Sequence, residues 1–344
     1  MPPQKPLLWG LLVQMGYNTY ADRDAPGFWA AANNPYLSSS TSVRFDRATW
    51  NELTEAMVAA GMNAVVIGMA EAVRFASHPE LATEGAWSVD EVRDEVARLR
   101  GLGIEAIPKL NFSTAHDAWL GPYARMVSTE TYYRVCADLI AEAIVAFDRP
   151  RFFHLGYDEE NLDNQRHYDY VVIRQHDLWW HDFLFFVEQV ERAGARPWIW
   201  SDYVWDHLDE FAARMPRSVV QSNWYYDPNF DLAVDEANYR RSRATHGKDP
   251  IRDERTRTTP LRAYLELDRL GFDQIPAGSI NHTYGQPIDN FEGTVRFCAE
   301  QIAPERLLGF LQTVWRPVLP EFRDRHLASI EAVRRGKAAY EQGG

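Results

Sequence analysis

Residues 129–160, TETYYRVCADLIAEAIVAFDRPRFFHLGYDEE, decide the fold of this chain because they contain one complete helix-to-strand unit. Apolar side chains recur at helical spacing over residues 129–147, and a compact apolar run follows over residues 152–157. Only a short polar link separates the two segments. The stretch therefore predicts an amphipathic helix that leads directly into a buried strand.

The same unit recurs on both sides of this stretch, so that strand-like runs and amphipathic segments alternate along the whole sequence. The expected strands span residues 7–15, 64–69, 105–112, 152–157, 196–201, 219–224, 274–280 and 308–314. The expected helices span residues 46–60, 89–102, 129–147, 170–193, 205–214, 260–270, 291–302 and 322–341. Strict alternation predicts a parallel sheet, and this number of repeats predicts one α/β domain over residues 1–344, a single (β/α)8 TIM barrel.

The lengths of the connections support a barrel. Helix-to-strand connections are short, as in GLG before Ile104, whereas two strand-to-helix connections, residues 16–45 and 225–259, are long. Barrel enzymes build their active sites from the second kind of loop, so we expect both long loops on the active-site face. A doubly wound open sheet is the alternative fold, but QMGYNTY after the first strand offers no Gly-rich phosphate turn.

Charge and cysteine content exclude several classes of protein. Lys and Arg total 36 against 49 Asp and Glu, a net charge of −13, which disfavours nucleic acid and anionic membranes as partners. The N-terminal MPPQKP has no signal-peptide pattern, so we expect a cytoplasmic protein unless a signal precedes this sequence. Cys136 and Cys298 are interpreted as small buried hydrophobes, not as disulfide or zinc ligands. Self-association into a homo-oligomer is left open.

The end of the fourth expected strand carries two adjacent carboxylates, Asp158 and Glu159. Because side chains alternate along a strand, His154, Gly156 and Asp158 are expected on one face, with Glu159 starting the loop. Paired carboxylates perform acid/base chemistry when their environments separate their pKa values. The alternative interpretation is an acidic lead-in to the next helix.

The third expected strand contributes Lys109 and Asn111 on one face, and His116 follows in the loop. The chain has only four lysines against 32 arginines, so a lysine inside a barrel strand is unusual. Lys109 is a candidate Schiff-base amine, but neutralisation of Asp158 or Glu159 is the favoured interpretation.

Tryptophan recurs at the ends of three other expected strands, as Trp200, Trp224 and Trp315, with Tyr284 close to a further strand end. Aromatic faces stack on the C–H faces of a pyranose, so these residues predict a sugar-binding wall; core packing is the alternative. No Cys/His cluster has metal-ligand spacing, and we expect neither a metal nor a cofactor. The seventh-strand segment IPAGSINHTYG lacks a carboxylate, which favours a substrate-assisted glycosidase over one with a nucleophile on that strand.

The segment FFHLGYDEE resembles the His-x-Gly-Gly-Asp-Glu signature of glycoside hydrolase family 20, the β-N-acetylhexosaminidases. IEAIPKLNFSTAHDAW, RPWIWSDYVWD, VVQSNW and LLGFLQTVW are similar to its third-, fifth-, sixth- and eighth-strand segments. The resemblance implies that Glu159 is the general acid and base and that Asp158 orients the substrate's 2-acetamido group. It also implies that His116 tunes Glu159. The further substrate-binding candidates are His154, Asn111, Trp200, Trp224, Tyr284 and Trp315.

The sequence departs from the family pattern at several positions. Tyr157 replaces the second Gly of the signature, which predicts bulk beside the catalytic pair, and Trp9 stands where the family has an Arg. Lys109 and Asn111 replace a Glu and an Asp, and the Trp-x-Glu of the eighth strand becomes Trp315-Arg316-Pro317. We therefore expect a divergent relative with a changed sugar specificity.

The leading hypothesis is a retaining, substrate-assisted glycosidase that removes a terminal β-linked N-acetylhexosamine or a related sugar, with a carbohydrate as its partner. A sugar-binding barrel without turnover is the first alternative. A lyase or aldolase that depends on Lys109 is the second.

Overall fold

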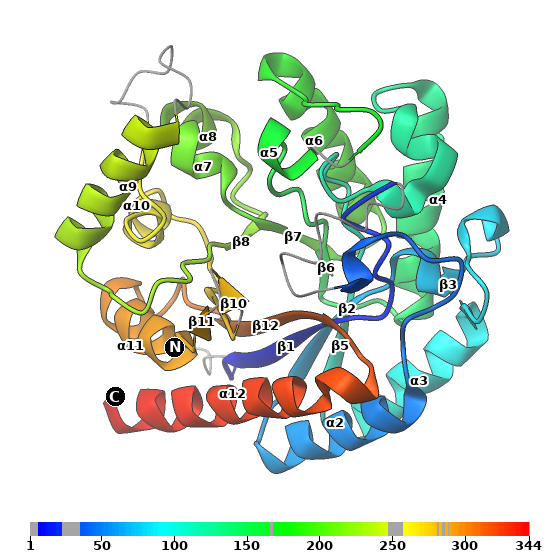
Figure 1. Cartoon of the computed structure of the whole chain (residues 1–344), viewed down its shortest axis with the longest axis horizontal. Coiled ribbons are helices and arrows are strands. Elements are labelled where there is room, and N and C mark those ends of the chain that lie inside the picture. The colour runs from blue at the N-terminus through cyan, green and yellow to red at the C-terminus, as the bar shows by residue number, and fades with distance from the viewer. Residues whose placement is uncertain are drawn as a thin grey trace. The chain divides into compact units, whose positions relative to one another are not determined.

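The computed structural model describes residues 6–22, 35–165, 168–246, 257–280, 282–283, 286–287 and 289–343. Its main sheet has eight strands in the order β8-β7-β6-β5-β2-β1-β12-β9 (Figure 1). Isolated parallel bridges Gln221↔Gln274 and Trp224↔Ala277 join the β8 and β9 segments at the two ends of this order. The fold is the predicted α/β (β/α)8 TIM barrel.

The chain forms two compact units, which are described separately. The larger unit comprises Leu12–Ile199 and Trp315–Leu327; the smaller unit comprises Met1–Leu11, Trp200–Val314 and Ala328–Gly344. Whether residues 1–344 act as one domain, with loops 16–45 and 225–259 on the active-site face, stays a prediction.

The larger unit holds the strands β2 to β7 and the helices α2 to α6. Its strands are β2 (Ala64–Gly68), β3 (Val73–Arg74), β4 (Trp87–Ser88), β5 (Glu105–Lys109), β6 (Phe152–His154) and β7 (Arg196–Trp200), the last of which ends at the unit boundary. Its helices are α2 (Arg47–Ala59), α3 (Val89–Gly101), α4 (Glu130–Ala146), α5 (Leu162–Gln165) and α6 (His176–Arg192). Figure 1 shows α2, α3, α4 and α6 on the outer side of β2, β5 and β6.

Parallel register in this unit brings the ends of neighbouring strands together. Val66 of β2 pairs with Ile107 of β5, Lys109 of β5 pairs with His154 of β6, and His154 pairs with Trp198 of β7. Because the strands are parallel, the residues that follow Lys109 and His154 emerge at the same edge of the sheet.

Side-chain caps begin the helices where the sequence predicts. Ser88 and Glu91 form a capping box at the start of α3, in which each side chain bonds the other residue's backbone N–H. The Asp46 carboxylate accepts from Thr49 N at 2.7 Å at the start of α2, and Thr129 caps α4 in the same way.

Three predicted boundaries in this unit are wrong. The strand predicted over residues 105–112 ends at Lys109. The helix predicted over residues 170–193 begins only at His176, because the β-branched run from Val171 to Ile173 stays non-helical. The strand predicted over residues 152–157 ends at His154, because Gly156 and Tyr157 have φ values of 69° and 72°. Strand alternation therefore does not extend to Asp158.

The smaller unit holds the remaining strands and helices, with part of β1 (Leu8–Gln14) and of β12 (Gly309–Pro317). Its other strands are β8 (Val220–Ser222), β9 (Ala277–Ser279), β10 (His282–Thr283) and β11 (Gln286–Pro287). Its helices are α7 (Tyr203–Asp206), α8 (Leu208–Arg214), α9 (Leu232–His246), α10 (Ala263–Arg269) and α11 (Phe291–Gln301), together with most of α12 (Arg323–Gly343). Helix α9 occupies part of the connection that was expected to be a loop over residues 225–259.

Trp9 lies in the packing between strand and helix. Its buried ring stacks on Phe310 of β12 at a centroid distance of 5.1 Å and meets Tyr340 of α12 edge-on at 5.9 Å. The Trp9 side chain is therefore used in packing against α12, and the correspondence of this position to the family's Arg stays a prediction.

Both cysteines are buried, as predicted. Among the helices of the described ranges, none has the length and apolar character that crossing a membrane requires.

Candidate active site

Three predicted residues of the larger unit meet beyond the ends of β5 and β6. The Nε2 atom of His116 lies 3.1 Å from Oε2 of Glu159 and 3.5 Å from Oδ2 of Asp158. The side chains of His116 and Asp158 are each 9% exposed, whereas that of Glu159 is 38% exposed. The two adjacent carboxylates therefore have different environments, one buried and one partly exposed, as the two carboxyl groups of acid/base sites often do.

Asn111 fixes the position of Asp158 and of the backbone before it. Its Nδ2 donates to Oδ1 of Asp158 at 2.8 Å, and its Oδ1 accepts from the backbone N–H groups of Ser113 at 3.0 Å and Tyr157 at 3.1 Å. A Cβ atom at Gly156 would lie 2.0 Å from Asn111 Oδ1. The Asn111 amide thus requires glycine at position 156. The same amide links the loop after β5 to the loop after β6.

The backbone around the carboxylates adopts a conformation that L side chains rarely take. Tyr157 and Glu159 have φ values of 72° and 60°, on either side of Asp158. Such residues each cost about 1–3 kcal/mol and persist where surrounding contacts enforce them. Here the contacts include the Asn111 amide and the Ser113 hydroxyl, which donates to the backbone carbonyl of Asp158.

The Tyr157 side chain points away from the carboxylates. It is 2% exposed and packs against Trp179 and Phe183 of α6, with the guanidinium carbon of Arg174 4.4 Å from its ring centre. The expectation that Tyr157 adds bulk beside the catalytic pair is therefore wrong. The positive φ turns the side chain towards α6.

A buried ion pair between Arg174 and Glu160 stabilises the loop that carries Asp158 and Glu159. Arg174, whose side chain has no exposed surface, bonds Glu160 and also donates to the backbone carbonyl of Phe112 at 2.7 Å. Glu160 in turn accepts from Thr114 N at 3.0 Å. Sequence reasoning missed this pair, although Glu160 adjoins Glu159 and a third carboxylate at a strand end was a signal to look for a cation.

Lys109 and His154 are buried near Asp158. Burial lowers the pKa of Lys109 to about 8, and the negative charge of Asp158 acts in the opposite direction. Burial and the charge of Lys109 lower the pKa of His154 well below its usual value, so the imidazole is neutral at neutral pH. His154 is 0% exposed and packs on Trp198 at 4.8 Å between ring centroids. A role in substrate binding for His154 stays a prediction.

The pKa of His116 is raised, whereas that of His154 is lowered. Burial opposes its protonation, but the carboxylates of Asp158 and Glu159 outweigh this cost and raise the pKa of His116. The imidazolium form is thus favoured between the two carboxylates.

Two tyrosines of the loop after β1 belong to the same region, and sequence reasoning missed both. The rings of Tyr20 and His116 lie 5.5 Å apart between centroids, and those of Tyr17 and Tyr20 lie 5.4 Å apart. Glu71, in the turn that follows β2, accepts from Tyr17 N at 2.7 Å and so holds this loop. The segment QMGYNTY could have indicated them, because it follows the first strand in the same way that the other site residues follow the third and fourth strands.

Trp315 also lies in the larger unit, near the end of β12, with a φ of 51°. Its carbonyl accepts from Tyr17 Oη at 2.9 Å and from Arg316 Nη1 at 2.7 Å. Its indole is partly exposed. A sugar-stacking role for Trp315 stays a prediction.

Trp200 and Trp224 belong to the smaller unit, where they contact each other. Their ring centroids are 5.6 Å apart at 87°, and Trp205 lies 4.9 Å from Trp224. Trp200 is 1% exposed, so its indole mainly fills the interior, whereas Trp224 is partly exposed. Tyr284 lies outside the described residues. The lining of a sugar pocket by these residues stays a prediction.

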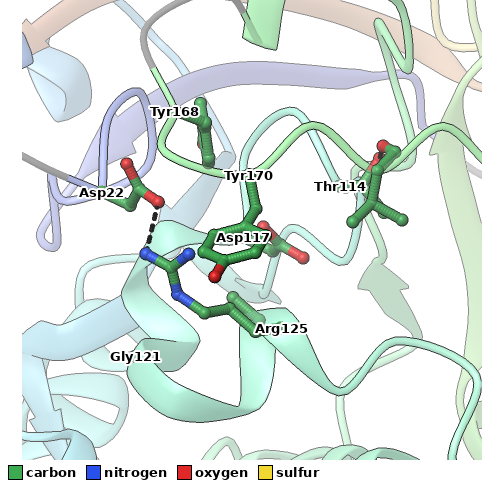
Figure 2. Close-up of a pocket in the computed structure, with 9 residues that line it drawn as sticks. Asp22, Thr114, Asp117, Gly121, Arg125, Tyr168 and Tyr170 are labelled. Carbon is green, nitrogen blue, oxygen red and sulfur yellow. Dashed lines mark hydrogen bonds and ion pairs between the residues drawn. The ribbon is translucent and has the colours of Figure 1, made fainter.

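A small pocket of the larger unit adjoins the residue that follows His116 (Figure 2). Asp117 is 2% exposed, and its Oδ2 atom has no hydrogen-bond partner among the described residues. Burial raises the pKa of Asp117 well above its usual value. At the pocket wall, Arg125 bonds Asp22 at 2.8 Å and covers the Tyr170 ring at 4.3 Å.

The atoms of the His116–Asp158–Glu159 group also have the proximity of metal ligands. Each residue offers one ligand atom, and these atoms lie within 4.8 Å of one another. Three protein ligands are the number that a catalytic zinc site uses. The expectation that the site uses no metal stays a prediction.

Known structures share this fold, whereas no family model and no curated protein matches the sequence. The β-N-acetylhexosaminidase from Bacteroides fragilis NCTC 9343 aligns with a TM-score of 0.57 and 14% identity, over 94% of this chain and 65% of that chain. The family 20 exo-β-N-acetylglucosaminidase from Vibrio harveyi, in complex with N-acetylglucosamine, aligns with a TM-score of 0.55 and 12% identity, over 95% and 54%. The Flavobacterium johnsoniae chitobiase aligns with a TM-score of 0.57 and 15% identity, over 87% and 48%.

These similarities are structural. At identities of 12–15% they show that this chain has the barrel found in family 20 enzymes. The chain spans between 48% and 65% of the length of these three structures.

Proposed function

We propose that this protein is a divergent family 20-like glycoside hydrolase that removes a terminal β-linked N-acetylhexosamine or a related sugar. The observation that carries the proposal is the unequal carboxylate pair, in which Asp158 is held by Asn111 and Glu159 is partly exposed beside His116. The shared fold with family 20 enzymes supports it.

Glu159 is the general acid and base in this proposal. Its carboxyl group gives a proton to the leaving glycosidic oxygen and later takes one from the attacking water. A proton donor needs access to the substrate, and Glu159 is the exposed member of the pair. General acid–base catalysis of this kind contributes about 10²–10⁴-fold.

Asp158 acts on the substrate's own nucleophile. In a substrate-assisted reaction the acetamido oxygen attacks the anomeric carbon while the glycosidic bond breaks, and positive charge develops on the acetamido nitrogen. A fixed carboxylate that accepts a hydrogen bond from that N–H stabilises this charge. Asn111 holds Asp158 at 2.8 Å, so no reorientation is needed when the charge forms.

The test compares single amide replacements of the two carboxylates on 4-nitrophenyl N-acetyl-β-D-glucosaminide. Glu159→Gln removes the acid and should lower kcat/KM by about 10²–10⁴-fold. Asp158→Asn should lower kcat with little change in KM, because it removes transition-state charge stabilisation. Asp94→Asn, on the exposed face of α3, is the matched control. Full activity of Glu159→Gln would refute the assignment.

A sugar-binding protein without turnover is the main alternative. Calorimetric binding of N-acetylglucosamine, together with no product from any aryl glycoside, would favour that alternative over hydrolysis.

Lys109 supports a second candidate function, because its burial lowers the pKa of the amine to about 8 and so makes it more nucleophilic at neutral pH. A lyase or aldolase that depends on Lys109 would be trapped by borohydride as a reduced adduct with a carbonyl substrate. Trapping that survives in Lys109→Arg would exclude this role.

A further inference from the structure

We propose that the pocket beside Asp117 binds one monovalent cation of about the size of a water molecule, such as potassium or ammonium. The bound ion would hold together the loops that surround His116. The pocket lies in the larger unit, and neither Asp158 nor Glu159 is among the residues that line it. The inference therefore goes beyond the proposed function, and its test requires no catalysis.

Asp117 provides the negative charge that a cation would neutralise. The residue is 2% exposed, and its Oδ2 atom has no hydrogen-bond partner in the described parts of the chain. Asp117 is also one of the residues that line the pocket (Figure 2). A buried carboxylate is costly unless a cation or hydrogen-bond donors compensate it. A ligand in the pocket would supply that compensation.

The charges around the pocket leave one negative charge unbalanced. The charged side chains of the lining are Asp22, Asp117 and Arg125. Arg125 is already engaged, because its Nη2 lies 2.8 Å from Oδ2 of Asp22 and its guanidinium covers the ring of Tyr170. One remaining charge matches a monovalent ion. A divalent ion would overcompensate it and needs six or more oxygen ligands.

A second buried arginine near Asp117 is also engaged elsewhere. Arg174 attracts Asp117 electrostatically, but its guanidinium bonds Glu160 and lies 3.3 Å from Oδ2 of Asp182. Two carboxylates thus share the single positive charge of Arg174. Glu160 in turn repels the charge of Asp117. Asp117 therefore lies in a negative environment, which favours a bound cation.

The size and lining of the pocket suit a small cation without its hydration shell. The pocket has a volume of about 20 Å³, which holds one water-sized group and excludes a sugar. Besides the carboxylates, the lining includes the hydroxyl-bearing residues Thr114, Tyr168 and Tyr170. Oxygen atoms are the ligands that hard cations prefer, and they also accept the hydrogen bonds that ammonium donates.

Three loops of the candidate active site contribute to the pocket. Asp22 comes from the loop after β1, Asp117 from the loop after β5 and Tyr168 from the loop after β6. The backbone N–H of Asp169, next to Tyr168, donates to Oδ1 of Asp22 at 3.0 Å. The first and third loops are thus already joined, and an ion at Asp117 would bind the second loop to them.

The second loop carries His116, the residue beside the proposed general acid. Tyr168 Oη lies 2.8 Å from the carbonyl oxygen of Ala115 and 2.9 Å from that of Thr19. His116 lies between Ala115 and Asp117 in the sequence. His116 would therefore be held from both sides, because Tyr168 binds the residue before it and the ion binds the residue after it.

A proton competes with the cation for the same carboxyl group. Burial raises the pKa of Asp117 well above its usual value, so a proton neutralises the group when no suitable ion is present. Because ion and proton bind the same charge, binding of the ion releases the proton and becomes tighter as the pH rises.

The first experiment compares thermal midpoints at about pH 7.5 in three chloride salts of equal ionic strength. Potassium chloride and ammonium chloride supply the ion, whereas choline is too large for the pocket. At about 100 mM salt, the wild-type midpoint should be about 2–5 °C higher with potassium or ammonium than with choline. The larger of the two shifts identifies the preferred ion.

Variants test whether the effect depends on Asp117. Asp117→Asn keeps the shape of the side chain without its charge, so its midpoint should be the same in all three salts. In choline chloride it should be more stable than the wild type, whose carboxyl group then lacks a cation. Asp94→Asn, on the exposed face of α3, is the matched control and should respond to the salts as the wild type does. A wild-type midpoint that does not differ among the salts would overturn the proposal.

Crystals grown with rubidium chloride locate the ion directly, because rubidium replaces potassium and is recognised by its anomalous scattering. An anomalous peak beside the Asp117 carboxylate that is missing from Asp117→Asn supports the site. A water molecule there, without anomalous signal, would overturn it. Neither measurement uses a substrate, so failure of the cation site leaves the assignment of Glu159 to be decided by hydrolysis of the aryl glycoside.

Discussion

The Nε2 atom of His116 lies 3.1 Å from Oε2 of Glu159, and this contact makes protonation of one residue dependent on the other. The two carboxylates raise the pKa of His116, although its burial acts against this. The folded state therefore binds a proton more tightly at His116 than the unfolded state does.

This contact predicts a pH-dependent contribution to stability. Because the folded pKa is raised, the stabilisation is fully present below the unfolded value of about 6.5 and is lost as the pH rises through the folded pKa. Urea unfolding of wild type and His116→Gln should thus give a free-energy difference that is largest near about pH 5.5 and declines towards alkaline pH. A difference that stays constant with pH would contradict the proposed charge state.

Gly156 should tolerate no side chain, because its φ is positive and because a Cβ atom there would clash with Asn111. A comparison with Gly103 separates these two causes. Gly103 also has a positive φ, of 78°, but a Cβ atom there would meet nothing within 4 Å. Gly103→Ala therefore reports backbone strain alone, expected at about 1–2 kcal/mol. Gly156→Ala adds a clash with Asn111 and should cost more. Denaturant unfolding measures both, and equal losses would show that the Asn111 contact is not required.

The double replacement Asn111→Ala/Gly156→Ala extends this comparison. It removes the clash, so its cost should be smaller than the sum of the two single changes.

Asp117, like His116, predicts stability that falls as the pH rises, but here replacement of the side chain should stabilise the protein when no cation is bound. Its raised pKa means that the folded state holds a proton which the unfolded state releases above about pH 4, so wild-type stability falls as the pH rises from there. Asp117→Asn keeps the shape of the side chain without this penalty. Its thermal midpoint should exceed that of the wild type increasingly from about pH 4 towards pH 8. Asp94→Asn, on the surface of α3, should show no such trend.

Chelation tests whether the His116–Asp158–Glu159 group works with a metal ion. In the proposed mechanism these atoms transfer protons and stabilise charge, so dialysis against EDTA should leave hydrolysis of the aryl glycoside unchanged. Loss of activity on dialysis, with recovery on addition of zinc or another divalent ion, would instead assign the three residues as ligands.

The repeating pattern of the chain was predictable because it depends on local periodicity. The alternation of strands and helices, the α3 capping box and the burial of Cys136 all follow from residues close in sequence. Asp158, Glu159, His116 and Asn111 were also found from sequence, because parallel strands bring their ends to one edge.

What the sequence did not reveal depends on contacts between distant segments. The early end of β6 reflects the Asn111 amide bonding Tyr157 N, a contact between the loops after two different strands. Arg174, read as part of a helix, instead lies before α6 and bonds Glu160. Trp9 stands where the resembled family has an Arg, and its ring packs on α12.

The mutual fit of Asn111 and Gly156 constrains how this barrel can be altered by evolution or engineering. A loop 155–160 taken from another barrel would function here only if its residue at position 156 leaves room for the amide, and a longer side chain at position 111 would displace the recipient's own loop. The residues at positions 111 and 156 can therefore be exchanged only together. Chimeras with a crossover between β5 and β6 should fail more often than those with crossovers elsewhere in the larger unit.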